Sequence, residues 1–367
     1  MIRLTTPSIS NEEYSAIEDV LKSGFLVHDK ECDLFEKELA KYLGCDDVIV
    51  VSSCTAALHM SLIALGIGQG DAVIVPDFTF AATANVVELT GADVVPVDVV
   101  KNTYNIDCNK LKDIVEKWNG KKKLKAIIPV HEFGCPADMT SIMQIAKTYD
   151  LLVIEDAACA LGTVYDGKKV GTFGDLGCFS FHPRKALTTG EGGAITVNDK
   201  DLAKHLRLLR NHGMEDTPDG KDFVMPGYNY RMTNFQAAMG RTQLKKFDDW
   251  VEIRIKLQKE YRNELSGLKI SLPLEVPGHT WQSFMIVLPV EVNRKQLIEK
   301  MNEKNIQTGP GAQAIHCLKY YREKYNFNSE NLKNAEMIYK HGLILPFSQS
   351  INKEQISFIV QKLNECM

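Results

Sequence analysis

The chain has 367 residues, of which 44% are hydrophobic and 25% charged, a composition typical of a folded protein with one large and one smaller domain. Its formal net charge of −4 argues against nucleic acid or an anionic membrane as a partner. The nine cysteines are irregularly spaced without a C-x-x-C pair, and no histidines have ligand spacing, so neither a disulfide framework nor a metal site is expected.

The N-terminal residues contain no apolar signal core. No segment approaches the roughly 18 apolar residues that a membrane span needs. We therefore expect a cytoplasmic protein without a membrane partner, and the odd number of cysteines agrees with a reducing compartment.

Strands and helices alternate from about residue 46 to residue 200, as judged from hydrophobic period and turn residues. The predicted strands span 48–52, 72–76, 94–99, 125–130 and 151–154, and the predicted helices 55–65, 80–89, 105–118 and 138–149. This succession predicts an α/β fold with a mainly parallel sheet covered by helices on both faces.

The pattern changes after Gly193. Strands are predicted at 176–181 and 283–288. Helices are predicted at 199–210, 251–265 and 330–341, and a further helix begins with residues 235–247. We expect a large cofactor-binding domain over residues 1–248 and a smaller C-terminal α+β domain over residues 249–367.

Glycines at 66, 68 and 70 resemble a dinucleotide-binding fingerprint, but they follow a predicted helix and precede a strand. The fingerprint needs the reverse order, in which the helix dipole and amides face the pyrophosphate. We therefore interpret these glycines as a helix C-cap and turn.

A lysine, Lys185, closely follows the apolar strand 176–181, and Asp156 ends the apolar strand before it. Ligands of α/β sheets gather at the carboxyl ends of the strands. An amine that can form a Schiff base and a carboxylate that keeps a pyridine nitrogen protonated are the two groups that pyridoxal phosphate requires. The pair therefore predicts a pyridoxal phosphate site.

The small residues Ser52 to Ala57 leave a strand and start a helix, so their amides and hydroxyls can face a phosphate. A simple N-cap explains the same residues, and the nearby lysine and aspartate favour the phosphate. Ser180, at the end of its strand, can reach the same anion. The glycines at 190, 192 and 193 agree with a hairpin turn and also with close approach of backbone to a cofactor.

Together these motifs resemble the DegT/DnrJ/StrS family of pyridoxal-phosphate aminotransferases that act on nucleotide-linked keto sugars. The resemblance covers nearly the whole chain and implies the aminotransferase fold type I. It rests on the following segments: 7–9, 23–26, 55–59, 78–85, 155–158, 180–193, 209–213 and 227–232.

The resemblance implies roles for individual residues. Lys185 matches the Schiff-base lysine, which also moves a proton between the substrate carbon and the cofactor, and Asp156 matches the partner of the pyridinium nitrogen. Phe80 matches the ring that stacks on the cofactor, and Asn229 a contact from the neighbouring subunit, which implies a homodimer with shared active sites. The phosphate contacts are matched by Thr55, Ala56 and Ser180.

Two positions depart from the family pattern. Cys159 stands near the cofactor ring where relatives have Gln or His, and the segment 308–313 reads T-G-P-G-A-Q where many relatives read T-G-V-H-Y-P. The first departure changes the side chain expected to contact the cofactor oxygen. The second lies in a segment expected to border the sugar substrate.

The predicted function is amino transfer from glutamate, through a pyridoxamine phosphate form, to a nucleotide-linked keto sugar for surface polysaccharide or glycoconjugate synthesis. A 4-keto-6-deoxy sugar is favoured because the residues around Glu191 are similar to those of relatives that act at C4. Three alternatives remain open: an aminotransferase for a small ketone such as an inosose or a phosphorylated ketone, a dehydratase, in which histidine replaces the lysine, and a non-catalytic regulator that binds the cofactor.

Overall fold

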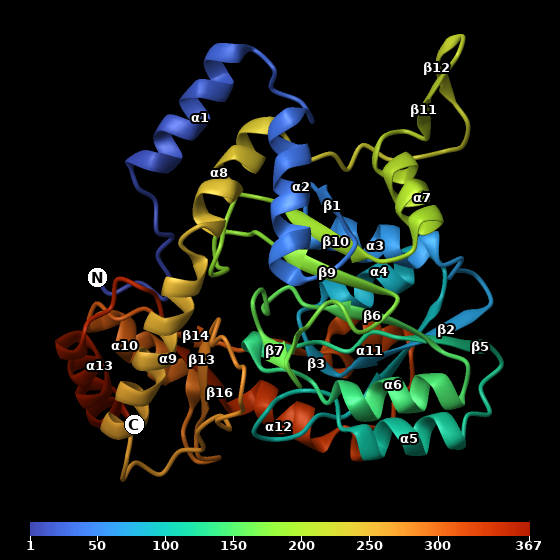
Figure 1. Ribbon diagram of the computed structural model, residues 1–367. Coiled ribbons are helices and arrows are strands. Elements are labelled where there is room, and N and C mark those ends of the chain that lie inside the picture. The colour runs from blue at the N-terminus through green and yellow to red at the C-terminus, as the bar shows by residue number, and fades with distance from the viewer.

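A seven-stranded sheet forms the centre of the computed structural model, which describes residues 1–367 (Figure 1). Its strand order is β1-β10-β9-β6-β5-β2-β4, and only β10 runs antiparallel to its neighbours. The strands are Asp47–Val51 (β1), Asp71–Pro76 (β2), Asp93–Val97 (β4), Lys123–Ile127 (β5), Leu152–Asp156 (β6), Leu176–Ser180 (β9) and Gly193–Val197 (β10).

Helices cover both faces of this sheet because successive side chains of a strand point to opposite sides. In β1, Ile49 and Val51 pack into one hydrophobic cluster, whereas Val48 and Val50 pack into another. The first face carries α3 (Cys54–Ala64), α4 (Ala82–Leu89) and α7 (Lys200–Arg210), and the second carries α2 (Lys30–Leu43), α5 (Cys108–Glu116), α6 (Met139–Thr148) and α8 (Asn234–Leu244).

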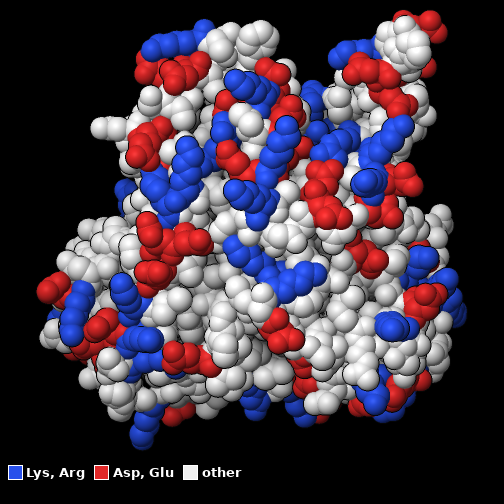
Figure 2. All heavy atoms as spheres, viewed as in Figure 1, with Lys and Arg blue, Asp and Glu red and all other residues white.

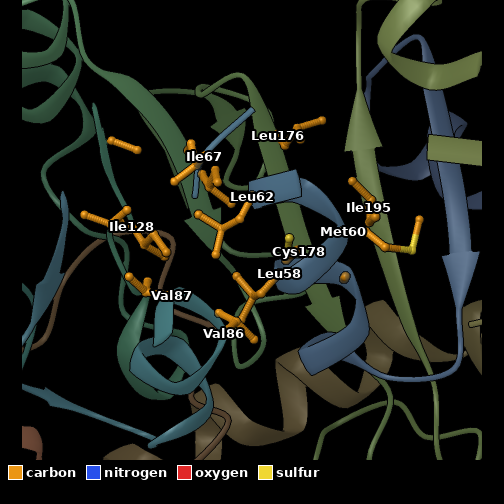
Figure 3. Packing of buried hydrophobic residues seen from close by; sticks show 14 of the residues in the cluster. Leu58, Met60, Leu62, Ile67, Val86, Val87, Ile128, Leu176, Cys178 and Ile195 are labelled. Carbon is orange, nitrogen blue, oxygen red and sulfur yellow. The ribbon is translucent and has the colours of Figure 1, made fainter. Parts of the chain in front are cut away.

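Helix α3 lies at the centre of the largest cluster. Figure 3 shows Leu58, Met60 and Leu62 of this helix between α4 and the strands β9 and β10. Leu58 and Leu62 are one helical turn apart and both almost fully buried, and each contributes about 1.5–3 kcal/mol by burial. This packing fixes the start of α3 relative to the carboxyl ends of the strands.

The predicted strands and helices of the large sheet are confirmed, with shifted ends. The helix expected from residue 80 begins at Ala82 because Phe78–Thr79 forms a short strand, β3, paired with Gln313–Ala314 (β15). The strand expected from residue 125 begins at Lys123, whose N–H donates to Gly70 O. The glycines at 66–70 form the turn that follows α3, as expected.

The C-terminal part contains a second, antiparallel sheet of order β13-β16-β14, formed by Phe284–Val287, Gly342–Leu345 and Gly309–Pro310. A cluster of buried residues joins this sheet to α9 (Phe247–Glu264), α10 (Arg294–Glu303) and α13 (Lys353–Cys366). The N-terminus also reaches this part, since Ile2 exchanges backbone hydrogen bonds with the segment 305–307. The domain boundary at residue 248 stays a proposal.

Helix α1 (Asn11–Ser23), which has no counterpart among the predicted elements, packs on α8. None of the helices combines the length and apolar character that crossing a bilayer requires. Figure 2 shows basic and acidic side chains interspersed on the visible face. The remaining elements are β7 (Val164–Tyr165), β8 (Lys168–Lys169), β11 (Met214–Thr217), β12 (Gly220–Phe223), α11 (Lys319–Lys324), α12 (Lys333–His341) and the 3₁₀ helices η1 (Glu132–Gly134), η2 (Ile315–Cys317) and η3 (Ser329–Asn331).

Candidate active site

The carboxyl ends of three neighbouring parallel strands bring the candidate residues together. Asp156 is the last residue of β6, Ser180 is the last residue of β9, and Lys185 follows in the loop after β9. Strand β5 lies on the other side of β6. The structure thus places the predicted lysine and aspartate at one edge of the sheet, where α/β folds bind their ligands.

Asp156 is buried and held in a fixed orientation. Its carboxylate accepts hydrogen bonds from the Thr83 hydroxyl at 2.8 Å and from Ala158 N–H at 3.1 Å. Burial raises the pKa of Asp156, while these hydrogen bonds and the charge of Lys185 act in the opposite direction. A buried carboxyl group of this kind gains most from a cationic partner, and a protonated pyridine nitrogen is such a partner.

The Lys185 side chain reaches Cys159, with 3.0 Å between Nζ and Sγ. Burial raises the pKa of the Cys159 thiol. The loop that carries the lysine is anchored from the C-terminal part of the chain, because Gln282 Nε2 donates to Arg184 O at 2.8 Å. The amine is therefore positioned within reach of a ligand bound beside Asp156.

The N-terminus of α3 offers a place for an anion. Ser53 caps the helix by accepting Ala56 N–H at 3.1 Å, and the first amides of a helix have no acceptor within it. Gly193 packs directly against this turn, since a Cβ there would lie 2.5 Å from the carbonyl carbon of Ser53. The exposed Thr55 adds a hydroxyl.

The other predicted residues lie around this edge. Phe80, 67% exposed, stands just before α4, and the next residue donates its N–H to Gln313 Oε1 at 3.2 Å. Ser180 Oγ accepts His182 N–H at 3.4 Å. Asn229 pairs with Asn211 through a backbone bridge, and no hydrogen bond joins its side chain to Lys185 or Asp156 within the chain.

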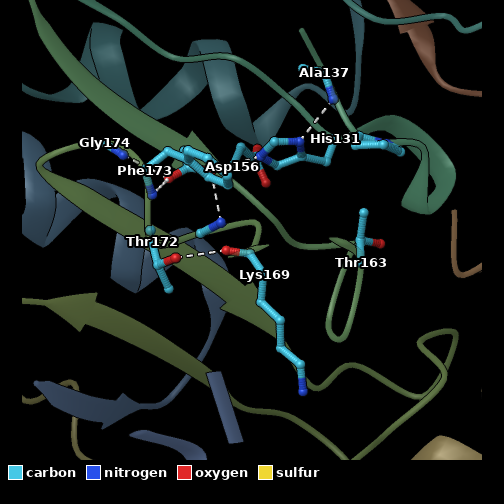
Figure 4. Close-up of polar contacts among 12 residues, drawn as sticks. His131, Ala137, Asp156, Thr163, Lys169, Thr172, Phe173 and Gly174 are labelled. Carbon is cyan, nitrogen blue, oxygen red and sulfur yellow. Dashed lines mark hydrogen bonds and ion pairs between the residues drawn. The ribbon is translucent and has the colours of Figure 1, made fainter. Parts of the chain in front are cut away.

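Glu155 has a positioning role that the sequence did not indicate. Its carboxylate accepts the N–H groups of Gly171, Phe173 and Gly174 at 2.7, 2.6 and 2.8 Å. His131 Nδ1 accepts Ala137 N–H, so His131 Nε2 carries the proton and donates to Glu155 at 3.0 Å. Figure 4 shows His131 and the loop around Phe173 and Gly174 close to Asp156. These hydrogen bonds hold β6, which carries Asp156, against the loop that leads into β9.

Glu132 is a second residue that sequence reasoning missed. It is 4% exposed, and the charges of Lys185 and Asp156 both act on its pKa. The only sequence signal was a charged residue just after an apolar strand.

An amine, a buried carboxylate and a helix N-terminus fit the carbonyl, the ring nitrogen and the phosphate of pyridoxal phosphate. The family model for DegT/DnrJ/EryC1/StrS aminotransferases matches residues 7–364. The chain belongs to this family. The resemblance drawn from the sequence motifs is therefore confirmed.

Curated relatives match over almost the full length. GDP-perosamine synthase of Caulobacter vibrioides is 38% identical over 340 residues, which cover 91% of this chain and 89% of the relative. The spore coat polysaccharide biosynthesis protein SpsC of Bacillus subtilis is 34% identical over 98% of this chain and 95% of the relative.

Among solved structures, the putative sugar aminotransferase Spr1654 of Streptococcus pneumoniae in its PMP form superimposes with a TM-score of 0.92 at 25% identity, covering 98% of each chain. A PLP form of the same protein also matches. The fold is that of type I aminotransferases, as predicted. The protein is a pyridoxal-phosphate-dependent transaminase of a sugar aminotransferase family.

Proposed function

We propose that the protein transfers the amino group of glutamate to a nucleotide-linked 4-keto-6-deoxy sugar and so provides an amino sugar for surface polysaccharide or glycoconjugate synthesis. The main support is the arrangement of Lys185 and Asp156 at one sheet edge, beside the N-terminus of α3. Two relatives add to it, because one is named for GDP-perosamine and the other for spore coat polysaccharide.

In this proposal each residue has a separate task. Lys185 would hold the cofactor through its amine and would act as the base that moves a proton at the substrate carbon. Asp156 keeps the ring nitrogen protonated. When bound, pyridoxal phosphate supplies an electron sink for the negative charge that develops at the substrate carbon. The remaining contacts are assigned to Thr55, Ala56 and Ser180 at the phosphate, Phe80 on the ring face, Cys159 near the ring edge and Asn229 from a second subunit.

The sharing of Asn229 requires a homodimer. Apolar side chains that monomers usually bury are exposed on the N-terminal segment and on β12, including Phe25, Val27 and Phe223 at 66%, 66% and 65% exposure. Exposed apolar groups of this kind favour contact with a partner chain. A second copy of the chain is the partner that the proposal requires.

The position of amination is proposed from the turn before β10. Glu191 lies in this turn, and its backbone O accepts hydrogen bonds from Thr189 Oγ1 and Gln236 Nε2. The turn is thereby held at the site edge, next to the strand that carries Gly193. The resemblance of these residues to relatives that act at C4, drawn from the sequence motifs, is the support for a 4-keto substrate.

Borohydride reduction followed by peptide mass analysis tests the role of Lys185. The reduced cofactor is expected on Lys185 alone, and Lys185→Ala should remain folded while losing turnover. Fixation on another lysine would overturn the assignment.

A substrate panel tests the rest of the proposal. Nucleotide-linked 4-keto sugars, 3-keto sugars and small phosphorylated ketones are each offered with glutamate, and formation of 2-oxoglutarate and amino product is followed. Turnover with the 4-keto sugars is expected. Amination of only a 3-keto sugar would contradict the position, and amination of only a small ketone would contradict the substrate class.

A further inference from the structure

Seven acidic residues of the chain are buried, and six of them have a protein partner for their carboxyl group. Glu13 and Lys246, Glu36 and Arg210, Asp77 and His316, Asp98 and Lys110, Glu155 and His131, and Asp156 and Thr83 form these six pairs. Glu132, 4% exposed, is the seventh, and its carboxyl group takes part in none of the hydrogen bonds or ion pairs of the protein. Neither carboxyl oxygen of Glu132 is among the fully enclosed side-chain atoms that lack a partner, so the group is open to a ligand from outside the chain.

The backbone around Glu132 is held rigidly at the active edge. Glu132 begins η1, directly after β5, and its N–H donates to Asn105 Oδ1 at 2.9 Å. The preceding His131 donates its N–H to Asp156 O at 3.1 Å. Phe133 has a positive φ of 54°, which is strained for a residue with a side chain. The backbone around Glu132 is thus fixed next to the strand end that carries Asp156.

Burial favours the protonated form of the Glu132 carboxyl group. Burial raises the pKa of Glu132 to about 8, with Lys185 lowering it and Asp156 raising it further. The group is thus a neutral acid at neutral pH and can donate a hydrogen bond to an anionic oxygen. Cys159, which lies against Lys185, offers only a weak sulfhydryl donor.

We propose that Glu132 is a cofactor-binding residue that donates its proton in a hydrogen bond to the oxygen on carbon 3 of the pyridoxal ring. This inference rests on the proposed roles of Lys185 and Asp156. In the ring, carbon 3 and its oxygen lie between the nitrogen side, assigned to Asp156, and carbon 4, whose carbonyl is assigned to Lys185. The phosphate arm leaves from the other side of carbon 4 and is assigned to α3. Since the residue before Glu132 donates its N–H to Asp156 O, a donor at this position is matched to the ring oxygen.

The test compares Glu132→Leu, which removes the donor, with Glu132→Gln, which keeps a donor but cannot titrate. Glu303→Gln, at an exposed position at the end of α10, is the matched control. For each protein, pyridoxal phosphate affinity and the pH midpoint of its visible absorbance are measured, together with the melting temperature of the cofactor-free form.

We expect Glu132→Leu to lower cofactor affinity about tenfold or more, in line with the loss of a hydrogen bond to a charged group, and to shift the absorbance midpoint. Glu132→Gln should bind the cofactor with intermediate affinity. The cofactor-free form of Glu132→Leu should melt at a higher temperature than the parent, because an unpartnered buried carboxyl group is removed. The control should match the parent in all three measurements.

Unchanged affinity and absorbance in Glu132→Leu would overturn the proposal, as would a change confined to the KM of a substrate, which would make Glu132 a substrate contact. Borohydride fixation on Lys185 is followed in the same variants. If the cofactor is not fixed on Lys185 in the parent protein, the proposed function itself is wrong. If it is fixed there and the spectra of Glu132→Leu are unchanged, only the role of Glu132 is contradicted.

Discussion

Asp156 and Glu132 are two buried carboxyl groups at the same edge of the sheet, and their surroundings differ. Asp156 has two hydrogen-bond donors in fixed positions, which favour the ionised form. Glu132 has none, and burial keeps its proton on at neutral pH. Environment, more than residue type, therefore supports the opposite tasks proposed for the two groups, as in other sites with paired carboxyl groups.

Substitution of Asp156 by Asn tests the role of its charge. The amide oxygen can still accept from Ala158, so the fold and cofactor binding should be retained. Loss of the charge opposite the ring nitrogen should lower kcat by about 10²–10³, the size of other single electrostatic losses in catalysis. Steady-state kinetics with a parallel absorbance check of cofactor content measures this, and near-normal turnover would contradict the assignment.

The pH dependence of cofactor-free stability tests the environment of Glu132. Its pKa is about 8 in the folded protein and 4.5 in the unfolded reference, so the folded state binds the proton more tightly. Its contribution to stability is fully present below about pH 4.5 and is lost as the pH rises toward about 8. Denaturant unfolding of Glu132→Gln and the parent across this range should reveal a loss with rising pH that is smaller in the variant. Parallel curves would contradict the raised pKa.

At the scale of elements, the site depends on how β10 meets the start of α3. The antiparallel strand β10 lies between β1 and β9, and its first residue, Gly193, packs against the turn at Ser53. The helix proposed to bind the phosphate and the strand preceding the lysine loop are thereby held in one arrangement.

Gly193→Ala should disturb this junction. The added Cβ would lie 2.5 Å from the carbonyl carbon of Ser53 and 2.6 Å from Cys54 N, which are backbone atoms that cannot rotate away. We expect a loss of about 1–3 kcal/mol in the free energy of unfolding, together with weaker cofactor binding. Gly309→Ala is the matched control, because its Cβ would meet only Leu4 at 3.7 Å. Equal stability of the two variants in denaturant unfolding would contradict the prediction.

At the scale of the whole molecule, two parts of the chain meet around the site. Gln282 from the C-terminal part holds the backbone of the lysine loop, and Gln313 holds the residue after Phe80. The segment 308–313 therefore lies at the wall of the candidate active site through the pairing of β15 with β3.

Hybrid dimers test whether a second copy completes the site. Lys185→Ala and Asn229→Ala homodimers should each be nearly inactive. Mixing them under subunit exchange should restore activity, because one of the two sites in each hybrid contains neither substitution. Exchange is verified with differently tagged chains, and an absence of recovery after verified exchange would count against shared sites.

Much of the large sheet followed from the sequence. Apolar runs and turn residues are local properties, so β1, α3 and β6 were predicted within one to two residues of their observed ends. The positions of Asp156 and Lys185 after apolar strands were also local, and parallel strands carry their carboxyl ends to one edge. Helix α1 was not predicted, and its observed position depends on contacts with α8, more than two hundred residues later.

The sequence by itself therefore determined the fold class and the cofactor and led to the proposal of Lys185 and Asp156 as its two central residues, because hydrophobic period and strand-end motifs are read over short stretches. Only the tertiary structure decided which polar side chains have hydrogen-bond partners within the chain. Glu155 and Glu132 are both glutamates at or just beyond strand ends. They differ because the loop 171–174 supplies hydrogen-bond donors to Glu155, whereas no segment supplies a partner to the carboxyl group of Glu132. Burial and long-range partners set the chemistry of a carboxyl group, and both arise only when distant segments pack together.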